Sequence, residues 1–197
     1  MSTFNVLVAG VGGQGVLLTS KILAEASLLS GFDIKQSEVH GMAQRGGSVV
    51  SQVRFGEKVC SPIVSEGECD LLIGFEPLET ARYLHFLKDG GQVVYNTHRI
   101  TTLTVSIGAD VYPDNIQDII AANAAGVHPF DATGLAVQAG NKRTLNLVLL
   151  GAAMRYLPLK DEHIKESIEK CVPRKALETN MRAFQAGREF FASSCCI

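Results

Sequence analysis

Three glycines near the start of the sequence, Gly10, Gly12 and Gly15, have the spacing G-x-G-x-x-G. A glycine-rich turn that enters a helix presents unpaired backbone N–H groups, and such groups bind phosphate. Gly10 would allow the tight turn, Gly12 would let a phosphate approach, and Gly15 would let helix and strand pack closely. The predicted chemistry is phosphate binding, with a purely structural turn as the alternative. The candidate binding residues of this turn are Gly10, Gly12, Gly13, Gln14 and Gly15.

A dinucleotide cofactor needs one more residue, a carboxylate at the end of the second strand that binds the ribose. Asp33 has roughly the required spacing, but it begins the expected second strand, which ends at Gln36 and Ser37. The sequence therefore argues against NAD binding. A self-sufficient nucleotide-dependent oxidoreductase stays open as an alternative function.

The stretch SEVHGMAQRGG, residues 37–47, fits neither helical nor strand periodicity and is expected to be a polar loop. Glu38 and His40 could form an acid–base pair. No nucleophile or metal-binding constellation accompanies them, so contact with a ligand or a partner is the preferred interpretation, with a purely structural loop as the alternative. The candidate contact residues of this loop are Glu38, His40, Gln44 and Arg45.

Two polar residues follow or end buried strands further along the chain. Glu76 comes after the run CDLLIGF in the stretch CDLLIGFEP, and Asn96 ends the run QVVYN. Because ligands of open α/β sheets bind at the carboxyl ends of parallel strands, we expect both residues near the glycine turn. Glu76 could bind a hydroxyl group or a partner's arginine, or cap the next helix. Asn96 could bind the ligand or form a turn.

The elements that must position these residues alternate between strands and helices, which predicts an α/β fold. We expect a Rossmann-like three-layer sandwich with a mixed, mostly parallel sheet, a β-hairpin insertion and C-terminal helices, in a single domain over residues 1–197. The hairpin is expected to pair residues 48–55 with 59–64, with Pro62 on an edge. Further strands are expected over residues 4–9, 32–36, 69–75, 92–96, 102–107 and 128–131. Helices are expected over residues 14–30, 76–88, 115–125, 132–139, 144–156, 161–170 and 174–191.

Composition excludes several classes of function. Lys plus Arg number 18 against 20 Asp plus Glu, without a basic cluster, so no nucleic-acid partner is expected. The sequence has no uninterrupted run of 18 apolar residues, so no membrane span is expected. It also shows no secretion signal, so a cytoplasmic location is expected. None of the five cysteines has C-x-x-C spacing, so neither a metal site nor an iron–sulfur cluster is expected in this chain.

Two stretches together resemble a known family. VLVAGVGGQGVLLTSKILAEA and SEVHGMAQRGGSVVSQVRFG are similar, in this order, to the small gamma-type subunits of 2-oxoacid:ferredoxin oxidoreductases. The form EVHGMAQRGG most resembles the indolepyruvate branch of that family, where the corresponding subunit is called the beta subunit. The later stretch NLVLLGAA and the C-terminal helices fit as well, so the resemblance covers nearly the whole chain.

The resemblance implies an enzyme that oxidatively decarboxylates aryl 2-oxo acids such as indolepyruvate, forms acyl-coenzyme A and reduces ferredoxin. Thiamine diphosphate and iron–sulfur clusters do that chemistry, yet this chain has no G-D-G…N-N signature and no cluster-binding cysteines. The resemblance therefore implies that this chain is an accessory subunit, inactive alone, and that a larger catalytic subunit carries those cofactors. The corresponding domain of family members is associated with coenzyme A binding. The resemblance assigns this binding role to Gly12, Gly13, Gln14 and Gly15. His40, Gln44 and Arg45 match the family loop without an assigned role, and a non-catalytic structural subunit stays open.

Overall fold

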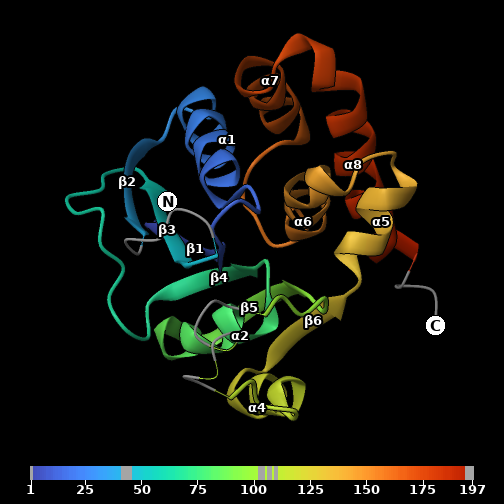
Figure 1. Cartoon of the computed structure of the whole chain (residues 1–197). Coiled ribbons are helices and arrows are strands. Elements are labelled where there is room, and N and C mark those ends of the chain that lie inside the picture. Colours follow the sequence, from blue (N-terminus) through green and yellow to red (C-terminus); the bar gives the residue numbers. More distant parts are fainter. Residues whose placement is uncertain (1, 41–45, 102–104, 106–107, 109–110, 194–197) are drawn as a thin grey trace.

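The computed structural model describes residues 2–40, 46–101, 105, 108 and 111–193 of the chain. Its strands form one six-stranded sheet in the order β2-β3-β1-β4-β5-β6 (Figure 1). Strands β1, β4, β5 and β6 run parallel, whereas β3 is antiparallel to both of its neighbours. The predicted α/β fold with a mixed, mostly parallel sheet is confirmed.

The bounds of the elements agree with most of the expected segments. The strands are β1 (Phe4–Val11), β2 (Asp33–His40), β3 (Ser48–Gly56), β4 (Cys69–Gly74), β5 (Leu87–Asn96) and β6 (Gly126–Phe130). The helices are α1 (Val16–Leu29), α2 (Pro77–Arg82), α4 (Ile116–Asn123), α5 (Ala132–Gln138), α6 (Leu145–Ala153), α7 (Asp161–Cys171) and α8 (Arg174–Ser193), with 3₁₀ turns η1 (Leu84–Phe86) and η2 (Lys142–Thr144).

The central strands β1 and β4 are buried on both faces, as is usual in parallel sheets. Val6 and Val8 of β1 point into a core shared with α1, α6, α7 and α8, and the alternate residues Leu7 and Ala9 point into a second core. Helices α2 and α4 cover that second face (Figure 1). This alternation is why β1 reads as a continuous apolar run.

The hairpin forms from other segments than those expected. Strand β2 pairs antiparallel with β3 from Asp33 opposite Gly56 to His40 opposite Val49. The predicted loop over residues 37–47 therefore begins as strand, and Glu38 lies within β2. The expected arm over residues 59–64 is not a strand. The hairpin is thus β2–β3, and β3 inserts between β2 and β1.

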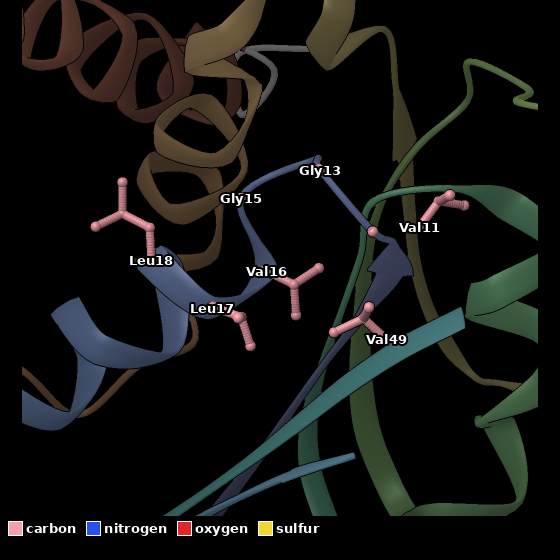
Figure 2. Close-up of a pocket in the computed structure, with 8 residues that line it drawn as sticks. Val11, Gly13, Gly15, Val16, Leu17, Leu18 and Val49 are labelled. Carbon is pink, nitrogen blue, oxygen red and sulfur yellow. The ribbon is translucent and has the colours of Figure 1, made fainter. Parts of the chain in front are cut away.

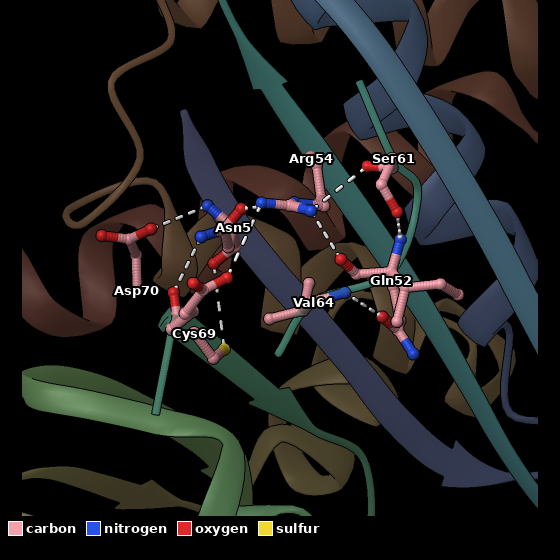
Figure 3. A network of polar contacts seen from close by, with 9 residues as sticks. Asn5, Gln52, Arg54, Ser61, Val64, Cys69 and Asp70 are labelled. Carbon is pink, nitrogen blue, oxygen red and sulfur yellow. Dashed lines mark hydrogen bonds and ion pairs between the residues drawn. The ribbon is translucent and has the colours of Figure 1, made fainter. Parts of the chain in front are cut away.

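Both edges of β3 are occupied by β1 and β2, and side chains of β3 hold residues 59–64 beside the sheet instead (Figure 3). Arg54 donates to the carbonyls of Ser61 and Ile63, at 3.3 and 2.5 Å, and to Asn5 Oδ1 at 2.9 Å. The Gln52 Oε1 atom accepts the Val64 N–H at 2.6 Å. Side chains thus occupy backbone groups that a partner strand would have used, and Pro62 offers no N–H.

Replacement of Arg54 by alanine tests this network. Because Arg54→Ala leaves two backbone carbonyls and Asn5 Oδ1 without this donor, we expect the free energy of unfolding to fall by about 2 kcal/mol. Urea denaturation followed by circular dichroism measures the change. The exposed Lys58 in the adjacent turn gives the control, and Lys58→Ala should change stability by less than about 0.5 kcal/mol. Equal effects of the two substitutions would contradict the role of Arg54.

The expected helix over residues 76–88 is shorter than its pattern suggests. Helix α2 ends at Arg82, the turn η1 follows, and β5 already begins at Leu87. A register shift between Cys69 and Leu71 lets β5 pass through its glycine pair, with Gly90 at φ 76°. Most of the candidate strand over residues 102–107 falls outside the described residues.

The cysteines and acids of the described part of the chain do not form a metal site. Cys69 is buried in β4, and its burial raises the pKa of the thiol to about 12. Burial also raises the pKa of Cys171. A protonated thiol is a poor ligand and nucleophile, so Cys69 serves the core. Among the described helices, none has the length and apolar character needed to cross a bilayer.

Candidate functional site

The turn between β1 and α1 places a helix N-terminus at the carboxyl edge of the sheet (Figure 2). Gly13 and Gly15 have φ values of 100° and 96°, which side-chain-bearing residues rarely adopt. Gly15 is the N-cap of α1, and no described side chain caps this helix. The first N–H groups of α1 lack partners within the helix and carry partial positive charge. The turn therefore has the geometry of an anion site.

The structural roles of the individual glycines differ from those expected from the sequence. Gly10 lies inside β1, where an added Cβ would come within 2.7 Å of Phe75 Cβ, so it serves close packing and not the turn itself. The Gly12 N–H donates to the Gly47 carbonyl at 2.8 Å, so it is already engaged. Gly13 and Gly15 hold the left-handed positions instead.

The side chain of Gln14 braces the turn from within. Its Oε1 atom accepts the Val11 N–H at 2.6 Å, and its Nε2 donates to the Phe75 carbonyl at 3.1 Å. The turn is thereby tied to the end of the neighbouring strand β4. Gln14 also lines two of the clefts described below.

Asn96 lies at the same edge, fully buried. Its Nδ2 donates to the Phe75 carbonyl at 3.2 Å and to Thr133 Oγ1 at 3.1 Å, and its Oδ1 accepts the Thr133 N–H at 3.3 Å. Asn96 therefore joins the ends of β4 and β5 to the first turn of α5. Its predicted place beside the glycine turn is correct, and all of these contacts are internal.

Glu76 is likewise fully buried and caps α2. Its carboxylate accepts the Glu79 N–H at 3.1 Å, the Ile100 N–H at 3.3 Å and the Tyr112 hydroxyl at 2.6 Å. Burial and the Glu76 carboxylate raise the pKa of Tyr112. These contacts match the capping alternative for Glu76, because a ligand would have to displace an internal donor to reach it.

The loop after β2 approaches the glycine turn through its last residues. Ser48 begins β3 opposite Val11, and its hydroxyl donates to Glu79 Oε2 at 2.5 Å. Burial raises the pKa of Glu79, and the Ser48 bond and Arg82 oppose this rise. Together with the bond from Gly12 to Gly47, this contact fixes where the loop rejoins the sheet at the start of β3.

The structure describes only some of the candidate contact residues of this loop. Glu38 is exposed on β2 and accepts a bond from Gln36 at 2.9 Å. Gln44 and Arg45 lie outside the described residues, as does the side chain of His40. The suggested acid–base pair of Glu38 and His40 therefore stays a prediction.

The sheet order bears on the dinucleotide alternative. Glu38 lies two residues before the carboxyl end of β2. A carboxylate therefore does stand close to the position that a ribose-binding acid occupies. However, β3 lies between β1 and β2, which puts Glu38 two strands away from the glycine turn, about 10 Å. The adjacent β1–β2 arrangement of the dinucleotide fold is therefore absent from this sheet.

Three clefts open around the glycine turn, and Gly13 lines all of them. The first, about 530 Å³, is mostly apolar and runs along Val16, Leu17 and Val49 (Figure 2). The second, about 460 Å³, extends toward Arg143 and Lys175. The third, about 270 Å³, is lined by residues that include His98, Thr133, Lys142 and Arg143.

The basic residues of these clefts were not among the residues expected from the sequence. A local signal for them exists, because Lys142 and Arg143 stand just before α6, and Arg174 and Lys175 begin α8. Cations at helix N-termini oppose the helix dipole. Such a break of a local rule is typical of functional sites.

The fold and the glycine turn define the class of protein: a Rossmann-like α/β chain with an open helix N-terminus at the carboxyl edge of its sheet. The model of the pyruvate ferredoxin/flavodoxin oxidoreductase family matches residues 5–190, and the chain belongs to this family. The predicted family membership is confirmed.

Similar proteins include the indolepyruvate oxidoreductase subunits IorB of Thermococcus kodakarensis and Pyrococcus horikoshii. They are 44% and 43% identical, and each alignment covers 95% of both chains. The gamma subunit of a keto/oxoacid ferredoxin oxidoreductase from Geobacter sulfurreducens has a similar structure, with a TM-score of 0.72 and 25% identity over 96% of this chain and 99% of that one. The chain is thus similar over nearly its full length to subunits of oxidoreductase complexes.

Proposed function

We propose that this chain is the accessory subunit of an enzyme that oxidatively decarboxylates indolepyruvate and related aryl 2-oxo acids to acyl-coenzyme A, with ferredoxin as electron acceptor. Its glycine turn forms one wall of the coenzyme A site, and a larger subunit carries thiamine diphosphate and the iron–sulfur clusters. The similarity to IorB subunits supports the substrate class. The lack of cluster-binding cysteine spacing in this chain supports the division of cofactors between subunits.

The observation that carries the coenzyme A assignment is the open N-terminus of α1 beyond Gly13 and Gly15. An added Cβ at Gly13 would meet no atom within 4 Å, so a ligand phosphate has space to approach the backbone there. When bound, coenzyme A supplies the thiol that accepts the acyl group. The residues of this chain orient its phosphates, and Gln14 holds the turn in shape through Val11 and Phe75.

The test uses the complex of this chain with its larger partner and the substitution Gly13→Ala. Because this change adds a methyl group and strain at the phosphate-binding backbone, we expect the KM for coenzyme A to rise at least about tenfold, the equivalent of about 1.4 kcal/mol. The KM for indolepyruvate should change less than about twofold, because that substrate reacts on the other subunit. Reduction of a viologen dye, first at varied coenzyme A and then at varied indolepyruvate, measures the two constants.

Gly31→Ala is the matched control. Gly31 also has a left-handed φ, 80°, and open space around its Cβ position, but it follows α1 at the opposite end of that helix. The control should retain the wild-type KM for coenzyme A. An unchanged KM in Gly13→Ala would contradict the coenzyme A assignment and favour a structural subunit. Turnover of indolepyruvate by the isolated chain would contradict the accessory role.

A further inference from the structure

The second cleft beside the glycine turn is built from the starts of three helices. Its lining includes Gly15 at the N-cap of α1, Thr144 at the N-cap of α6, and Lys175 in the first turn of α8. None of these three helices has an acidic residue in its first turn, and no described side chain caps α1 or α6. Three partial positive charges therefore converge on a cleft of about 460 Å³.

Two full positive charges add to these partial ones. Arg143 and Lys175 line the cleft, and both are exposed. Among the described residues, no carboxylate lies within ion-pair distance of either side chain, and none lines the cleft. Both cations are thus available to an anion from outside the chain.

An amide without an acceptor provides an independent sign of a ligand. Asn146 lines the same cleft and is only 2% exposed, and its Nδ2 has no hydrogen-bond partner among the described residues. It packs directly against Gly15, since a Cβ there would come within 2.9 Å of Asn146 Cβ. Buried amides are nearly always paired, so an unpaired one beside a helix N-terminus calls for an acceptor.

We propose that this cleft binds a phosphomonoester dianion, which in coenzyme A is the 3′-phosphate. The inference rests on the proposed function and deepens it. A monoester carries close to two negative charges and three terminal oxygens, which suit the guanidinium of Arg143 and the ammonium of Lys175. The diphosphate carries about one charge per phosphorus and suits the backbone N–H groups after Gly13. Both groups belong to one ribose unit, and the cleft contains Gly13 and Gly15 as well as both cations.

The experiment compares coenzyme A with dephospho-coenzyme A, which lacks only the 3′-phosphate, in the assembled complex. Selectivity is the ratio of kcat/KM for the two cosubstrates. We expect the wild-type complex to prefer coenzyme A at least about tenfold, and the double variant Arg143→Ala/Lys175→Ala to lose most of that preference. The charge-retaining pair Arg143→Lys/Lys175→Arg should keep a part of it. Lys58→Ala, at the opposite edge of the sheet, should keep all of it.

The outcomes separate this inference from the proposed function. A wild-type complex without preference, or a double variant with unchanged selectivity, would overturn the phosphomonoester site. If Gly13→Ala still raises the KM for both cosubstrates in that case, the proposed function stands alone. If Gly13→Ala has no effect on either cosubstrate, the proposed function falls with the inference.

Discussion

Gly187→Ala is expected to destabilise the chain by about 3 kcal/mol, although alanine has the higher helix propensity by about 1 kcal/mol. Gly187 lies on α8 where this helix crosses α6, and an added Cβ would come within 2.0 Å of the Val148 carbonyl oxygen. Backbone cannot yield as a flexible side chain can, so the helices must separate. Thermal denaturation should show a Tm lowered by about 6–12 °C.

The same helix supplies the control. Gln185 is exposed on α8, and Gln185→Ala should change stability by less than about 0.5 kcal/mol. Gly151 is the reciprocal contact on α6, since its Cβ would come within 2.1 Å of the Phe184 carbonyl oxygen. Once one methyl group has separated the helices, a second costs less, so the double variant should lose less stability than the sum of the single variants. A Gly187→Ala chain as stable as wild type would contradict the close crossing.

The close packing of these helices could be predicted from the small residues after Leu150, as could the N-terminal strand, glycine turn and helix. Their signals are local: an apolar run, glycines at fixed spacing and helical periodicity. Local signals also give the order of β4, β5 and β6, because each strand is followed by a helix or turn that leads to the next parallel strand.

The position of β3 could not be predicted in this way. Its own sequence indicates a strand, but its two partners are decided by contacts far apart in the chain. Phe55 packs its ring against Phe4 and Phe32, with centroids 5.4 and 5.7 Å apart, and so joins β3 to residues in or beside β1 and β2. Strand pairing depends on such cross-strand contacts more than on propensity, which is why the expected arm over residues 59–64 was wrong.

The candidate site was predictable only in part for the same reason. The glycine turn lies within one short segment, so its residues were found together. The second cleft takes Gly15, Arg143, Asn146 and Lys175 from three segments that meet only in the folded chain. What the sequence does contain is the unusual placing of basic residues before helices α6 and α8.

The two polar residues expected at the sheet edge were placed correctly, yet their neighbours give them structural contacts. This distinction makes Asn96→Ala the second informative substitution. It removes three hydrogen bonds that join β4, β5 and α5, and it leaves the Thr133 N–H without its acceptor. We expect the free energy of unfolding to fall by about 3 kcal/mol, since each lost bond costs about 1 kcal/mol. Urea denaturation of the isolated chain measures this loss.

The effect of Asn96→Ala on ligand binding should be small by comparison. The Phe75 carbonyl keeps its bond from Gln14, so the glycine turn stays tied to β4, and the KM for coenzyme A in the complex should rise less than about threefold. Asn123→Ala on α4 is the matched control, because Asn123 is exposed and its side-chain amide donates to the Ile119 carbonyl of its own helix. A stable Asn96→Ala chain whose complex binds coenzyme A much more weakly would instead mean that Asn96 contacts the ligand. Comparison of the loss of stability with the loss of coenzyme A affinity therefore decides whether Asn96 stabilises the edge of the sheet or contacts the ligand that binds there.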